Sequence, residues 1–100
     1  MAKQDIPDQI LNQDPTIDPT SYIASGAQVM GDVRCAAFSS IWYNCVLRGD
    51  INYIEIGERS NIQDLSMIHL ENDRPCVVGS DVTVGHRAIL HGCEIEDACL

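Results

Sequence analysis

The amino-acid sequence predicts an all-β domain, a parallel β-helix in which one chain winds around a single core in six-residue steps. Apolar residues recur along most of the chain, and nine of the twelve intervals between them are six residues. The position four residues after each recurrence is mostly small or apolar. An α-helix needs apolar spacing near 3.6, and a meander needs turn signals between alternating strands, so neither matches. The recurring residues are Ile17, Ile23, Val29, Cys35, Ile41, Leu47, Ile56, Ile62, Ile68, Val78, Val84, Leu90 and Ile95.

The repeat resembles that of the hexapeptide-repeat proteins, in which three hexads form one triangular coil of a left-handed β-helix. This resemblance implies slightly more than four coils, stacked at about 4.8 Å like ordinary paired strands. Three irregular intervals, Leu47 to Ile56, Ile68 to Val78 and Leu90 to Ile95, are expected to leave the coils as loops on one corner. Residues 1–15 lack the period, which predicts a polar N-terminal lead or arm before a β-helix over 16–100.

Composition excludes several classes of function. The net charge is -9 and Lys3 is the only lysine, which argues against nucleic acid or an anionic membrane surface as a partner. No apolar run approaches the roughly 20 residues that span a bilayer, and no secretory signal is recognisable, so we expect a cytoplasmic protein. The five cysteines form no Cys-x-x-Cys pair and lie among apolar residues, which favours buried, reduced thiols. A core this small also favours oligomerisation.

The repeat places two of the three histidines on one face. His69 follows Ile68 and His91 follows Leu90, and these two apolar positions are three steps, or one coil, apart. The two imidazoles are therefore predicted to lie one above the other, close enough to share a zinc ion. Arg48 likewise follows an inward apolar residue, Leu47, one coil earlier, and so extends the column.

His86 lies two residues, not one, after its inward apolar residue, Val84, and is predicted to point away from the other two histidines. It shares its phase with Asp64, one coil earlier, so these residues form a second column. If three copies pack around a threefold axis, the second column of one copy can face the first column of its neighbour. That arrangement completes a three-histidine site and sets Asp64 against Arg48. Three imidazoles leave one coordination position open, as in catalytic zinc sites. A polar subunit interface without metal is the alternative.

Beyond the repeat, several segments together resemble the γ-class carbonic anhydrases. The resemblance runs from about Ile17 to the end of the chain. The segments that carry it are Ser40-Ile-Trp-Tyr-Asn-Cys-Val-Leu-Arg-Gly-Asp50, Ile56-Gly-Glu-Arg-Ser-Asn-Ile-Gln-Asp64, Ile68-His69, Val84-Gly-His86 and Leu90-His-Gly-Cys93.

This resemblance implies a homotrimeric lyase that reversibly hydrates CO₂ to bicarbonate by a metal-bound hydroxide at each subunit interface. The implied ligands are His69 and His91 from one chain and His86 from the next. Zinc is the implied metal, with Fe²⁺ or Co²⁺ as alternatives.

Five further positions match polar residues of the family's site. Arg48 and Asp64 match an intersubunit ion pair, for which a purely structural interface role is the favoured interpretation. Asp50 matches a nearby structural and active-site carboxylate. Gln63 matches the residue that orients the hydroxide, and Asn61 matches a neighbour in the same polar shell.

The chain also departs from the family pattern. Ile51 replaces a glutamate of the most active members, and Glu71 and Asp73 are the nearest acidic candidates for a proton shuttle. Family members continue past the position of Leu100 through further coils to a C-terminal helix. We therefore expect a truncated form with metal binding, a trimer interface and weak or no hydration activity. The alternatives are a non-catalytic metal-binding hexapeptide-repeat protein and a hexapeptide acyltransferase with one histidine as general base.

Overall fold

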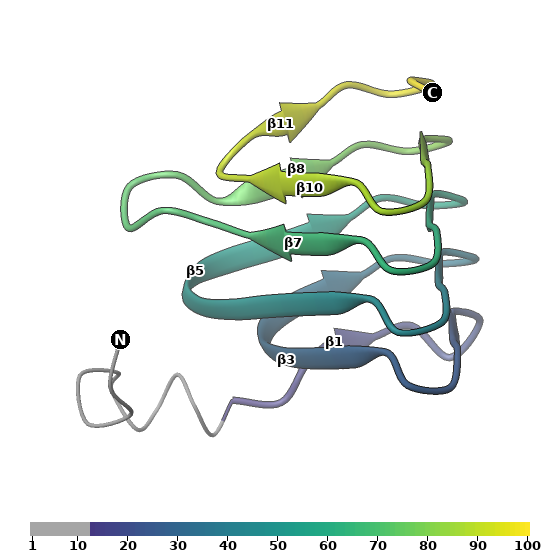
Figure 1. The fold of residues 1–100 in the computed structure, drawn as a ribbon, viewed down its shortest axis with the longest axis horizontal. Helices are drawn as coiled ribbons and strands as arrows, with labels where there is room; N and C mark the ends of the chain where they lie inside the picture. The colour runs from purple at the N-terminus through teal and green to yellow at the C-terminus, as the bar shows by residue number, and fades with distance from the viewer. Residues whose placement is uncertain (1–12) are drawn as a thin grey trace.

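A computed structural model describes residues 13–100, which form eleven β-strands and no helix (Figure 1). The predicted arm over 1–15 lies outside the described residues except for its last three. The strands wind in stacked coils from the N-terminal to the C-terminal end of the domain (Figure 1). They are β1 (Thr16–Ile17), β2 (Tyr22–Ile23), β3 (Gln28–Cys35), β4 (Ser40–Ile41), β5 (Val46–Ile56), β6 (Asn61–Ile62), β7 (Met67–His69), β8 (Cys76–Val78), β9 (Thr83–Val84), β10 (Ile89–His91) and β11 (Glu94–Ile95).

All pairing between the strands is parallel and follows the six-residue period. The first face holds β1, the ends of β3 and β5, β8 and β11. The second face holds β2, β4, β6 and β9, and the third holds the starts of β3 and β5, with β7 and β10. Every recurring apolar residue pairs with the one predicted for the next coil, which confirms a parallel β-helix of about four coils. The ladders are Ile17, Cys35, Ile56, Val78 and Ile95 on the first face, Ile23, Ile41, Ile62 and Val84 on the second, and Val29, Leu47, Ile68 and Leu90 on the third.

The core is a narrow column inside the coils. Ile41, Leu47, Ile56, Ile62 and Ile68 are completely buried, because each coil covers the apolar residue of the coil before it. The second inward position of several hexads is serine, and these buried hydroxyls donate to backbone carbonyls. The bonds run from Ser39 to Ala36, from Ser60 to Gly79, and from Ser66 to Gly85. A small polar side chain can therefore occupy the tight corner without leaving an unpaired hydroxyl.

Two of the three corners turn at residues with left-handed backbone conformation. Phe38, Arg59, Asp81 and Ala98 occupy one corner, and Asn44, Leu65 and Arg87 occupy another, each with φ between 58° and 65°. A side chain is normally unfavourable there. In this fold the backbone N–H of such a residue donates to the preceding coil, as from Arg59 to the Ala37 carbonyl (3.0 Å) and from Arg87 to the Asp64 carbonyl (3.0 Å). These hydrogen bonds between coils offset the energetic cost of the left-handed backbone conformation.

The irregular intervals all fall at the third corner, as the solenoid pattern predicts. The interval from Leu90 to Ile95 does not leave as a loop, because it is one residue shorter than the repeat and only two residues separate β10 from β11. The interval from Leu47 to Ile56 is not a separate loop either. It stays within the continuous strand β5, whose pairing with β3 shifts register at this point. Gly49 pairs with Gly31 but Ile54 pairs with Val33, so the extra residues of β5 lie opposite Asp32 as a bulge. The interval after β7 does protrude, and a bridge between Glu71 and Arg74 closes its turn (Figure 1).

Cys35, Cys45 and Cys76 are buried, Cys93 packs against the core, and Cys99 is exposed. All five thiols are free, as expected. Across residues 13–100, no helix has the length and apolar character that crossing a membrane requires.

Candidate functional site

The third face brings His69 and His91 together. They end β7 and β10, and the two residues are direct register partners on successive coils. Their ring centroids lie 5.4 Å apart with an angle of 79° between the ring planes, an edge-to-face arrangement. His69 is largely covered, whereas half of the His91 side chain is exposed. The predicted column is thus confirmed as a geometric pair.

Each of these imidazoles also has a carboxylate partner. His69 Nε2 lies 2.8 Å from Asp50 Oδ1, and His91 Nε2 lies 2.9 Å from Glu71 Oε1. Asp50 is 6% exposed and comes from the bulged part of β5, while Glu71 comes from the protruding turn after β7. Carboxylates in contact with histidine fix the tautomer and orientation of the ring, and metal-binding histidines commonly have such partners.

Arg48 lies one coil below His69 on the same face. Its Nε is 3.4 Å from Asp50 Oδ2, and 43% of its side chain is exposed. Within the part of the chain that the structure describes, Arg48 Nε is also the one buried side-chain polar atom without a hydrogen-bond partner. Asp64 lies on the second face, so one chain does not bring Arg48 and Asp64 together. Because Nε is buried against Asp50, only the terminal nitrogens of this partly exposed guanidinium could donate to a group outside the chain.

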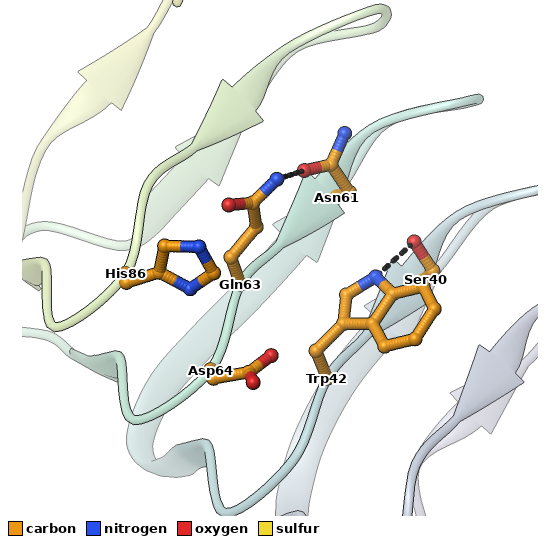
Figure 2. Close-up of a pocket in the computed structure, with 6 residues that line it drawn as sticks. All are labelled: Ser40, Trp42, Asn61, Gln63, Asp64 and His86. Carbon is orange, nitrogen blue, oxygen red and sulfur yellow. Dashed lines mark hydrogen bonds between the residues drawn. The ribbon is translucent and has the colours of Figure 1, made fainter.

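A shallow concavity of about 430 Å³ lies on the second face (Figure 2). Its lining combines the predicted site residues of this face with two residues that the sequence analysis did not select, Ser40 and Trp42. His86 and Asp64 share a column, as predicted, with His86 beside Gln63 (Figure 2). The lining residues are Ser40, Trp42, Asn61, Gln63, Asp64 and His86.

Hydrogen bonds organise the polar residues of this concavity. Gln63 Nε2 donates to Asn61 Oδ1 (3.1 Å), and Asn61 Nδ2 donates to Thr83 Oγ1 (3.2 Å). Separately, Trp42 Nε1 donates to Ser40 Oγ (2.9 Å). The carbonyl oxygen of Gln63 then remains on the side where His86 lies (Figure 2).

Ser40, Trp42 and Thr83 were not predicted from the sequence, but each occupies the same position in the six-residue repeat as a predicted site residue. Ser40 and Thr83 occupy the position of Asn61 on adjacent coils, because Asn61 pairs with both. Trp42 occupies the position of Gln63 one coil earlier. A search of the sequence for side chains in phase with Asn61 and Gln63 would have selected all three.

One chain therefore holds two imidazoles on one face and the third on another. Residues 13–100 contain no group of three or more histidine, cysteine, aspartate or glutamate side chains placed to hold a metal ion. The donor set on the third face nevertheless fits zinc in its chemistry, since two stacked imidazoles, each with a carboxylate partner, could supply two of the three nitrogen ligands that an open zinc site needs. The third ligand would have to come from another chain.

Comparisons with known proteins agree with this architecture. The chain is 43% identical over 94 residues to γ carbonic anhydrase 1 from Arabidopsis thaliana mitochondria, a match that covers 88% of this chain and 34% of the relative. It is 49% identical over 78 residues to a probable carbonic anhydrase from Methanocaldococcus jannaschii, covering 78% of this chain and 49% of the relative. No protein-family model matches the chain.

Among solved structures, a hexapeptide transferase family protein from Anaplasma phagocytophilum superimposes with a TM-score of 0.76 and 46% sequence identity. That match covers 80% of this chain and 46% of the other. The chain thus spans half the length, or less, of these relatives. Their fold and the parallel coils described above agree with a left-handed β-helix. The chain belongs to the hexapeptide-repeat proteins and resembles their γ-class carbonic anhydrase branch.

Proposed function

We propose that this chain assembles as a homotrimer that binds zinc at each subunit interface and hydrates CO₂ to bicarbonate. His69 and His91 of one chain and His86 of the next would hold the ion, with Fe²⁺ or Co²⁺ as alternative metals. The observation that carries this proposal is the stacked pair of His69 and His91, each imidazole in contact with its own carboxylate. Such a pair on an exposed face provides an incomplete set of ligands that a second chain can complete.

The polar residues of the two faces support assembly through a second copy. Arg48 on the third face has a side chain that is 43% exposed, and Asp64 on the second face lines an open concavity. When the second face of one copy meets the third face of its neighbour, Asp64 can accept a hydrogen bond from the terminal nitrogens of Arg48. Because an ion pair covered by an interface gains little net energy, we assign this pair to alignment of the subunits.

The chain's own residues would then have separate tasks. Bound zinc would lower the pKa of a coordinated water toward about 7 and so supply hydroxide at neutral pH. Asp50 would hold the His69 ring in one orientation. Gln63 would present its carbonyl oxygen as a hydrogen-bond acceptor, since the bond from its amide nitrogen to Asn61 turns the oxygen to the side of His86 (Figure 2). The indole of Trp42 would give the concavity an apolar wall suited to an apolar substrate.

Stopped-flow measurement of CO₂ hydration by the zinc-loaded protein tests this function. We expect saturable hydration above the zinc-only background and loss of most of it in Gln63→Ala, with zinc content unchanged. Gln28→Ala is the matched control, because Gln28 is an exposed glutamine of β3 outside the concavity. Zinc binding without any hydration by the wild-type chain would instead favour a non-catalytic metal-binding protein.

Acyl transfer is the second candidate, and it is favoured by the likeness to the hexapeptide transferase family protein. His86 would act there as a general base beside the concavity. Trp42 is the only tryptophan in the chain and lines this concavity, so its fluorescence should report occupancy by coenzyme A. Quenching by coenzyme A in metal-free protein, together with transfer of the acetyl group from acetyl-CoA to an added amine or alcohol and release of the coenzyme A thiol, would favour acyl transfer over hydration.

A further inference from the structure

We infer that Thr83 is a positioning residue of the proposed site, which anchors Gln63 through the carboxamide of Asn61. This inference rests on the proposed function, because it assigns Thr83 a role in the same reaction. Thr83 opens β9 on the second face, is partly buried, and lies just outside the residues that line the concavity. Its side chain would act on the reaction only through two hydrogen bonds.

The hydrogen bonds run in one direction, with Gln63 donating to Asn61 and Asn61 donating to Thr83. Thr83 Oγ1 accepts from Asn61 Nδ2 at 3.2 Å, and Asn61 Oδ1 accepts from Gln63 Nε2 at 3.1 Å. Both groups of the Asn61 carboxamide are therefore used, one toward Thr83 and one toward Gln63. The amide nitrogen of Gln63 is used as well, and its carbonyl oxygen stays on the side of His86 (Figure 2).

Two hydroxyl residues, Ser40 and Thr83, lie next to Asn61 in the ladder, and of these two only Thr83 accepts a hydrogen bond from the Asn61 side chain. Asn61 pairs with Ser40 on the preceding coil and with Thr83 on the following coil. The Ser40 hydroxyl accepts from Trp42 Nε1 at 2.9 Å. Among the described residues, Thr83 is accordingly the one whose side chain accepts a hydrogen bond from the Asn61 amide nitrogen.

The anchor matters because carboxamide side chains are flexible. Asn61 and Gln63 are only partly buried, so solvent can compete for their amide groups. Thr83 is β-branched and lies on a strand, which restricts its χ1 angle and gives its hydroxyl a nearly fixed position. Without that hydroxyl, the two amides would sample more rotamers, and the Gln63 oxygen would spend less time in one place.

Substitution of Thr83 by valine tests the inference, because valine keeps the shape and the strand preference but removes the hydroxyl. In Thr83→Val we expect kcat for CO₂ hydration to fall by about tenfold, with unchanged zinc content, since loss of outer-shell partners usually costs 10–100-fold. Thr83→Ser should restore most of the rate because it restores the hydroxyl. Thr16→Val on the exposed strand β1 is the matched control and should leave the rate unchanged. Thr83→Ala replaces the valine variant if that variant does not fold.

A spectroscopic readout separates this inference from the proposed function. Side-chain amide signals of Asn61 and Gln63, observed by ¹⁵N NMR, should shift and exchange faster with water in Thr83→Val and return in Thr83→Ser. If these signals shift while the wild-type chain shows no hydration, the proposed function fails and the anchoring role stands. If the signals stay in place, or if the rate in Thr83→Val equals that of wild type, the inference is wrong.

Discussion

His69 and His91 are register partners on successive coils, and their rings meet edge to face with centroids 5.4 Å apart. The pair exists because each histidine follows an inward apolar residue, Ile68 or Leu90, so both point outward from the same face. The Nε2 atom of each ring contacts a carboxylate from a different segment, the β5 bulge for His69 and the protruding turn for His91. The solenoid thereby presents two stacked imidazoles, the ligands proposed for the metal, on one face.

Asp50 should be needed for tight metal binding. We expect Asp50→Asn to weaken zinc affinity about 10–100-fold, because the amide no longer offers a charged acceptor to His69. Competition with a chromophoric chelator measures this change. Asp32→Asn is the matched control: Asp32 also follows a glycine one coil earlier, but it pairs with Arg34 at 3.1 Å. Equal loss of affinity in both variants would refute a specific role for Asp50.

Gly49 should be indispensable for close approach of the coils at the bulge. A Cβ atom there would lie 2.6 Å from the backbone oxygen of Asp32, so either coil would have to move. We expect Gly49→Ala to lower the free energy of unfolding by about 1–3 kcal/mol, as other overpacked sites do. Gly85→Ala should change it far less, since a Cβ there meets no atom within 4 Å. Urea unfolding of both variants, monitored by far-UV circular dichroism, makes the comparison.

The buried thiol of Cys76 should make stability fall at alkaline pH. Burial raises the pKa of Cys76 from its ordinary value of 9.0 to about 12. The folded chain therefore holds this proton more tightly than the unfolded chain, and the resulting stability is complete below pH 9 and declines as pH rises toward 12. The free energy of unfolding should fall less steeply between pH 8 and pH 11 in Cys76→Ala than in wild type. Parallel slopes for the two proteins would contradict this prediction.

The six-residue period, together with the three hexads per coil that the resemblance to hexapeptide-repeat proteins implies, was enough to predict the coils and the stacked histidines. A six-residue repeat fixes which residues point inward, and three repeats per coil fix which residues pair, so the pairing of Ile68 with Leu90 followed from their spacing in the sequence. Handedness could not be obtained this way, because coils of either hand have the same period. It came from the resemblance to other hexapeptide-repeat proteins.

The conformation of the segments that break the six-residue period could not be predicted from the repeat. Extra residues can leave a solenoid as a loop or stay in a strand as a bulge, and the repeat does not distinguish the two at Leu47 to Ile56. The contact between Glu71 and His91 depends on how the turn closes between Glu71 and Arg74, which is a local feature. Thr83 was missed because it acts through Asn61 and carries no distinctive chemistry of its own.

Zinc binding by mixed trimers tests most directly whether two chains share the site. His86→Asn and His69→Asn should each abolish tight zinc binding when present in all three chains. In a trimer selected by two affinity tags to contain both variants, one interface pairs intact His69 and His91 with an intact His86 from the neighbour. We predict that such mixed trimers regain about one zinc ion, measured by atomic absorption, since three neutral imidazoles complete the set. Mixed trimers of the correct mass that bind no more zinc than either parent would contradict the shared site.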